Sequence, residues 1–136
     1  MGATLNPYLA FAGTARQAME FYRDVFGGTL NLNTFGEFGA DAPTPDNIMH
    51  AQLETPSGFV LMASDTPPGM EHQPGNTISV SLSGDEGDAL RGYWAKLSEG
   101  GTVMMPLEKQ GWGDEFGMCA DKFGIQWMVN ISQPQA

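Results

Sequence analysis

The chain has 136 residues, six Lys and Arg against 16 Asp and Glu, and a formal net charge of −10. This charge argues against nucleic acid as a partner, because phosphate contacts need clustered Lys and Arg. No apolar run approaches the roughly 18 residues that would span a bilayer, and the N-terminal residues lack the pattern of a secretory signal. The one cysteine, Cys119, excludes an internal disulfide and a cysteine-based metal cluster. These features predict a cytoplasmic protein without nucleic-acid or membrane partners.

The first half of the chain predicts one helix among four strands. A strand over residues 5–12 precedes a helix that opens at Thr14 with a capping-box pattern. Gly27-Gly28 end the helix, because glycine readily takes the left-handed conformation of a helix C-terminus. Three further strands are expected over residues 29–36, 48–54 and 59–64, the last two joined by a hairpin.

The second half repeats this order. A strand over residues 77–83 precedes a helix with Asp85 as its expected cap, and Gly100-Gly101 end that helix. Strands follow over residues 102–109, 115–120 and 125–131. Each half therefore predicts a β-α-β-β-β unit of an α+β protein. The expected organisation is one domain with a first repeat of about 4–65, a linker over 66–76 and a second repeat of about 77–132. One helix covers one face of four strands, so the other face is expected to curl into a cleft.

Four segments carry a resemblance to a known superfamily. They are Asn6-Pro7-Tyr8-Leu9, the first helix with Phe21-Tyr22 and Gly27-Gly28, Ile48-Met49-His50-Ala51, and the C-terminal run from Trp112 to Val129. With the doubled unit, they resemble the vicinal oxygen chelate superfamily of glyoxalases, extradiol dioxygenases and bleomycin- and fosfomycin-resistance proteins. The chain looks most like its PhnB-like subgroup. The resemblance covers nearly the whole chain and implies the fold of that superfamily, two βαβββ repeats in a curled mixed sheet with helices outside.

The resemblance also implies where a divalent metal would be held in metal-using members, with one ligand, typically His or Glu, from each of four strands. Those positions fall at Pro7 or Asn6, near Met62 or Ala63, at Thr77 and at Met128. None of these is a good ligand for the hard ions of that chemistry. The sequence therefore predicts no bound metal and no cofactor.

Side-chain alternation predicts what lines the cleft. The apolar residues of the strand over 77–83 are expected to pack on the helices. The hydroxyl side chains of this strand are then expected to point into the cleft. The same alternation selects the cleft-facing residues of the other strands. His50, one of two histidines with His72, is either a polar contact in the cleft or an ordinary polar-face histidine. The cleft candidates are Leu9, Phe11, His50, Gln52, Thr77, Ser79, Trp112, Gln126 and Met128.

The remaining large apolar residues are expected in the core. Tyr22, Trp94 and Trp127 lie on apolar stripes and are predicted to be buried. Cys119 is expected to be a buried, inert thiol, and the nine methionines are expected to be mainly core fillers.

The predicted function is binding of a small molecule, neutral or weakly polar, or a metal-independent activity on an unknown substrate. Two alternatives remain open at this point: a metal-dependent lyase or dioxygenase of the same superfamily, and a protein that sequesters a drug. A homodimer is expected, because the resemblance implies that halves often meet across a two-fold axis.

Overall fold

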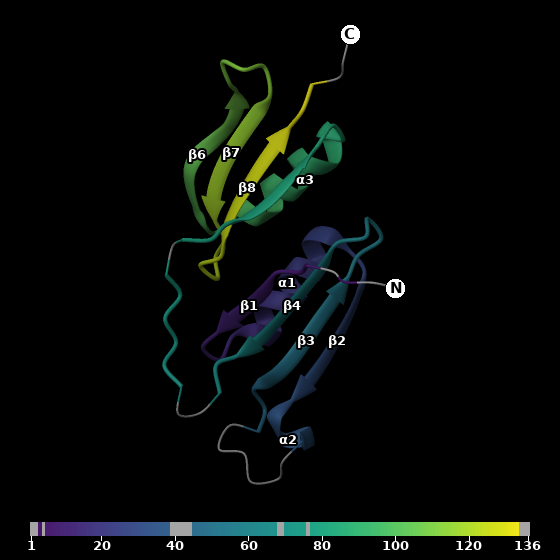
Figure 1. Ribbon diagram of the computed structural model, residues 1–136, viewed down its shortest axis with the longest axis vertical. Helices are drawn as coiled ribbons and strands as arrows, with labels where there is room; N and C mark the ends of the chain where they lie inside the picture. The colour runs from purple at the N-terminus through teal and green to yellow at the C-terminus, as the bar shows by residue number, and fades with distance from the viewer. Residues whose placement is uncertain (1–2, 4, 39–44, 68–69, 76, 134–136) are drawn as a thin grey trace. The chain divides into compact units, whose positions relative to one another are not determined.

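The computed structural model describes residues 3, 5–38, 45–67, 70–75 and 77–133 (Figure 1). Residues 68, 69 and 76 of the expected linker lie outside the described residues. The chain divides into two compact units, Met1–Pro74 and Gly75–Ala136. Each unit has its own four-stranded sheet with one long helix against it, so the predicted α+β class and the repeat are confirmed.

The first unit contains the elements β1 (Tyr8–Phe11), α1 (Ala15–Phe26), β2 (Thr29–Thr34), α2 (Phe35–Phe38), β3 (Ile48–Glu54) and β4 (Val60–Asp65). The strand order is β1-β4-β3-β2. Strands β1 and β4 run parallel, and the other pairs are antiparallel. The short helix α2 takes the place of the last residues expected in the second strand.

The second unit contains β5 (Val80–Gly84), α3 (Gly87–Ser98), β6 (Thr102–Lys109), β7 (Glu115–Ala120) and β8 (Gln126–Ile131). The strand order β5-β8-β7-β6 repeats that of the first unit, again with a parallel first pair. Strand β5 begins at Val80, three residues later than expected.

The core of each unit lies between the helix and the adjacent face of its sheet. In the first unit, α1 contacts β3 and β4 and buries Tyr22 and Met19 completely. In the second unit, Trp127 is 1% exposed, so the predicted burial of Tyr22 and Trp127 is confirmed. Trp94 differs and is half-buried. Its ring lies so close to β7 that a β carbon at Gly117 would come within 2.9 Å of it.

The start of α1 is stabilised differently from the prediction. The Thr14 side chain makes no capping hydrogen bond, so the expected capping box is wrong. Instead, the backbone N–H groups of Gly13 and Ala15 both donate to Oδ1 of Asp65, each at 2.9 Å. Asp65 is buried at the end of β4, so a carboxylate from a distant strand satisfies the free N–H groups of the helix start. Asp85 is likewise not the cap of α3, because Glu86 occupies that position without a side-chain hydrogen bond.

The two Gly-Gly pairs have the same geometry. Gly27 and Gly100 have φ angles of 76° and 77°, in the left-handed region. The second glycine of each pair has no room for a side chain, because a β carbon on Gly28 would overlap the carbonyl oxygen of Glu54, and one on Gly101 that of Ala120. Each pair thus ends a helix and lets the next strand pass close to its neighbour.

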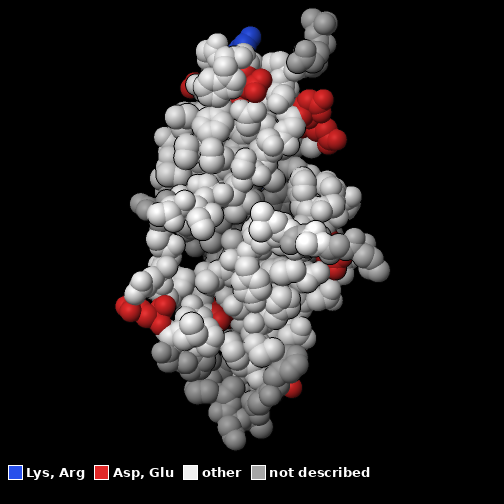
Figure 2. Space-filling model, viewed as in Figure 1, with Lys and Arg blue, Asp and Glu red and all other residues white. Residues whose placement is uncertain are grey.

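Figure 2 shows a mostly uncharged surface on which acidic side chains are scattered, in keeping with a charged fraction of 16%. Among the described residues, no helix is long and apolar enough to cross a membrane.

Candidate functional site

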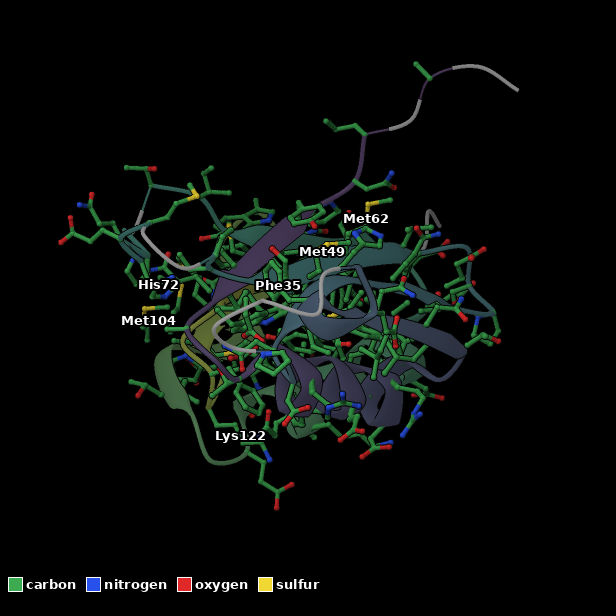
Figure 3. The ribbon with its side chains drawn as sticks, turned by 90° about the horizontal axis from the view of Figure 1, so that it is seen from below. Phe35, Met49, Met62, His72, Met104 and Lys122 are labelled. Atoms are coloured by element: carbon green, nitrogen blue, oxygen red, sulfur yellow. The ribbon has the colours of Figure 1, made fainter. Side chains whose placement is uncertain are left out.

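Each sheet has an open face, defined here as the face opposite its helix. In the first unit, the register aligns Tyr8, Met62, Gln52 and Asn31 in one row across this face. The neighbouring residues on the same strands, Leu9, Ala63 and Ala51, are buried on the helix side. Met62 of β4, which is labelled in Figure 3, is the thioether of this row. The open face of the first unit is therefore polar, with a thioether within it.

A tyrosine–histidine pair is the most specific feature of this face. The Tyr8 hydroxyl and Nδ1 of His50 are hydrogen-bonded at 3.1 Å, and the ring centroids lie 5.8 Å apart. Because β4 lies between β1 and β3 in the sheet, Tyr8 reaches across a strand to make this contact. Among the described residues, Nε2 of His50 has no hydrogen-bond partner. The pair fixes the imidazole and leaves one ring nitrogen available to a bound molecule.

The amides of this face are held by carboxylates. Gln52 Nε2 donates to Glu54 at 3.2 Å, and Asn33 Nδ2 donates to Glu37 at 3.3 Å. Each of these bonds occupies an amide donor and leaves the amide oxygen as an acceptor. His50 and Gln52 thus lie on the open face, as expected for cleft candidates.

Leu9 and Phe11 do not lie on the open face, so their predicted orientation is wrong. Leu9 is 8% exposed and Phe11 3%, and they pair with the buried Ala63 and Asp65. The alternation of β1 buries its more apolar residues, which exposes Tyr8 instead. Tyr8 was missed, although the rule that directed the hydroxyls of β5 into the cleft would have selected it.

In the second unit, the open face combines hydroxyls, amides and thioethers. Ser81, Met128, Met118 and Met105 form one row across its four strands. Ser79 Oγ donates to Oε1 of Gln126 at 3.2 Å. Asn130 Nδ2 donates to Asp114 at 3.1 Å. The predicted alternation of this unit is confirmed for β8, where Trp127 is buried and Met128 half-buried.

Two further candidates, like Ser79, lie outside the strands. Thr77 is exposed and precedes β5. Ile78 also precedes β5 and is 81% exposed, so the expectation that it packs on the helix is wrong. Trp112 lies in the turn before β7 and is 64% exposed. Its ring meets that of Phe116 edge to face, with centroids 6.1 Å apart.

The two acidic residues at the start of β7 already have partners. The Arg91 guanidinium donates to both oxygens of Glu115. This hydrogen bond lowers the pKa of the Glu115 carboxyl and raises that of Arg91. Asp114 accepts from Asn130. The two carboxylates therefore have separate partners, and the geometry gives no support for a carboxylate pair in acid–base work.

The residues at the implied metal positions do not fit a divalent ion. Pro7 has no donor in its side chain, Ala63 is buried on the helix side, and Met62 and Met128 offer thioethers. Hard divalent ions prefer carboxylate or imidazole ligands, whereas thioethers suit soft ions. Among the residues that the structure describes, no group of three or more His, Cys, Asp and Glu could hold a metal. His72 is half-buried, with Nδ1 hydrogen-bonded to the Thr66 hydroxyl.

An open cavity of about 250 Å³ lies elsewhere, at the start of α3. Asp85, Asp88, Arg91 and Ser132 contribute to its lining, and none of the nine cleft candidates does. Its one cation, Arg91, is paired with Glu115 and Asp88. The cavity is therefore not the site that the sequence indicates.

Comparison with known proteins agrees with this architecture. Residues 4–129 match the model of the glyoxalase/bleomycin resistance protein/dioxygenase superfamily. Protein YjdN of Escherichia coli K12 is 29% identical over 145 residues, which cover 96% of this chain and 97% of YjdN. Protein Mb0911c of Mycobacterium bovis is 32% identical, over 96% of this chain and 82% of its own.

Solved structures show the same fold. The crystal structure of PA1353 from Pseudomonas aeruginosa has a TM-score of 0.88 and 40% identity, covering 98% of this chain and all of the other. The PhnB protein from Bacillus cereus has a TM-score of 0.77 at 22% identity, covering 96% of this chain and all of the other. The predicted fold and the predicted resemblance are both confirmed.

Proposed function

Because the chain belongs to the glyoxalase/bleomycin resistance protein/dioxygenase superfamily, we propose that it binds a small, neutral or weakly polar organic molecule without a catalytic metal. The open face of each sheet presents binding groups of its own. Membership alone names no ligand, since one fold hosts many chemistries. The proposal therefore depends on the side chains of these faces.

The single observation that carries the proposal is the chemistry of the open-face side chains. The open faces present hydroxyl, amide and imidazole groups that donate and accept hydrogen bonds. These groups belong to Tyr8, His50 and Gln52 in the first unit and to Ser79 and Gln126 in the second. Met62 and Met128 provide apolar surface among them. On the open face of the second unit, thioethers lie beside a few placed polar groups, a combination that is typical of small-molecule sites.

The metal-independent part rests on the donors at the implied ligand positions. Pro7, Thr77 and Met128 offer no carboxylate or imidazole. A substrate that needs two vicinal oxygens chelated by a hard ion finds no suitable ligand set there. The molecule bound by this protein is accordingly held by hydrogen bonds and apolar contact.

A thermal-shift screen of small organic molecules, run with and without EDTA, tests the proposal. A compound at 100 times its dissociation constant stabilises the native state by about 2.7 kcal/mol. We expect shifts of the unfolding midpoint that EDTA leaves unchanged. Shifts that vanish with EDTA and return with one equivalent of Zn²⁺, Ni²⁺, Mn²⁺ or Fe²⁺ would instead establish a metal-dependent protein. No shift with any compound would reject the binding function.

We also propose that the protein is a cytoplasmic homodimer. The buried free thiol of Cys119 suits a reducing compartment, and the exposed apolar side chains of Val103 and Met104 on the edge strand β6 suit a chain that associates with a copy of itself. Analytical ultracentrifugation at nanomolar concentration tests the assembly. A stable, folded monomer of 14.6 kDa would reject the dimer.

A further inference from the structure

Three methionines lie side by side on the open face of the second unit. Met118 of β7 pairs directly with Met128 of β8 in a regular stretch of the ladder, and Met105 of β6 is paired with Met118 between two register shifts of β6. Directly opposite residues of neighbouring strands have β carbons about 4.5–5.5 Å apart. The three thioethers therefore form one continuous strip, the methionine row.

The methionine row is not part of the hydrophobic core. The residues next to Met128 along β8, Trp127 and Val129, are buried on the helix side with Cys119. Met118 and Met128 are half-buried, and Met105 is 40% exposed. Met19, by contrast, is completely buried under α1. The expectation that methionines mainly fill the core is therefore wrong for this face.

The surroundings of the methionine row favour a flat aromatic molecule. A thioether makes favourable contacts with aromatic rings, and the unbranched side chain adapts to the shape of what it meets. Two residues along β7 on the same face, Phe116 pairs with Asn130 and adds an aromatic ring, and the exposed Trp112 stands edge-on against that ring. Methionine sulfur and aromatic rings together form a surface for a π-system.

Charge and size indicate the same kind of molecule. The methionine row is itself uncharged. The hydroxyl–amide pair of Ser79 and Gln126 borders it on one side, and on the other side the carboxylate of Asp114 is occupied by a hydrogen bond from Asn130. Three strands span about 10 Å at the spacing of a β-sheet, which matches a bicyclic or tricyclic ring system. A stable protein partner needs about 800 Å² on each side, far more than this strip provides.

We infer that the methionine row is the subsite for the aromatic part of the bound molecule, and that this molecule is an uncharged, planar aromatic compound. The inference rests on the proposed small-molecule function and specifies its ligand class. The thioethers and Phe116 provide the apolar contact, and Gln126 and Ser79 provide hydrogen bonds at its edge.

The test uses the full-length protein with methyl-¹³C-methionine and the neutral probe N-phenyl-1-naphthylamine. We expect the probe to gain fluorescence on binding and to shift the methyl signals of Met105, Met118 and Met128, while the Met19 signal stays in place. The variants Met118→Gln and Met128→Gln are expected to raise the probe's dissociation constant at least tenfold. Met70→Gln, at a 66% exposed position outside both sheets, is the matched control and should leave it unchanged.

The outcomes separate this inference from the proposed function. If compounds from the thermal-shift screen bind but neither they nor the probe move the three methyl signals, the inference is wrong and the binding function stands. It is equally overturned if the bound compounds are charged or aliphatic, or if Met118→Gln dissociates a dimer without affecting the probe. If nothing binds at all, both fail. The methyl spectrum of the unmodified chain decides the question even where a glutamine variant does not fold.

Discussion

The hydroxyl of Tyr8 lies 3.1 Å from Nδ1 of His50, although the two residues belong to strands separated by β4. Tyr8 is 52% exposed, so the contact lies on the surface of the sheet and not in its core. Such a contact contributes little to folding but fixes the orientation of the imidazole on the open face.

Replacing Tyr8 with phenylalanine should therefore separate binding from stability. We expect Tyr8→Phe to change the free energy of unfolding by less than about 0.5 kcal/mol. The affinity for compounds that bind the first unit should fall, because His50 loses its orienting partner. Urea denaturation and calorimetric titration measure the two effects. Tyr93→Phe, on α3, is the control, and unchanged affinity in Tyr8→Phe would exclude the pair from the site.

The carboxylate of Asp65 should be far more important for folding. It accepts the N–H groups of Gly13 and Ala15 on one oxygen and that of Ile48 on the other, at 2.8 Å. In Asp65→Asn, one of these donors faces an amide NH₂ and stays unsatisfied in the interior. Leaving buried donors unsatisfied costs about 1–3 kcal/mol each, so we expect a loss of more than about 2 kcal/mol in urea denaturation. The exposed Asp46→Asn should match the wild type, and a similar result for Asp65→Asn would contradict this account.

Two glycines of the second unit should respond in opposite directions. Gly101→Ala forces a β carbon against the carbonyl oxygen of Ala120 and should destabilise the protein. Gly92 lies inside α3 with open space around it, so Gly92→Ala should stabilise by about 0.5–1 kcal/mol through the helix preference of alanine. Thermal unfolding compares the two variants. Equal midpoints would mean that the close approach at Gly101 is not a constraint.

The thiol of Cys119 should be inert while the protein is folded. Burial raises the pKa of this thiol from its ordinary value of 9.0 to about 11, with a smaller contribution from Asp121. Because the thiolate is the reactive form, a disulfide reagent at pH 8 should modify Cys119 only as fast as the protein unfolds. Fast labelling of the native protein would contradict its burial.

The same pKa shift makes a prediction about pH. The folded chain holds this proton more tightly than the unfolded chain, so the stabilisation is complete below about pH 9 and is lost as the pH rises toward about 11. Cys119→Ala should lack this part of the alkaline loss. Urea denaturation at several pH values in this range compares the two proteins.

The order of elements could be predicted from the sequence because it depends on local signals. The Gly-Gly pairs at 27–28 and 100–101 end helices in both halves, and the apolar stripe of each helix follows the helical period. The burial of Trp127 and the orientation of Met128 follow from alternation in β8. The superfamily resemblance depends on the same short segments, which is why it was visible without a structure.

The partners of individual side chains depend on strand pairing, which local patterns do not contain. Tyr8 meets His50, and Asp65 meets Ala15, only because β1 and β4 run side by side in parallel. The methionine row likewise exists only in the register of β6, β7 and β8. The residues 105, 118 and 128 share no sequence spacing, so their alignment is decided by hydrogen bonding between strands.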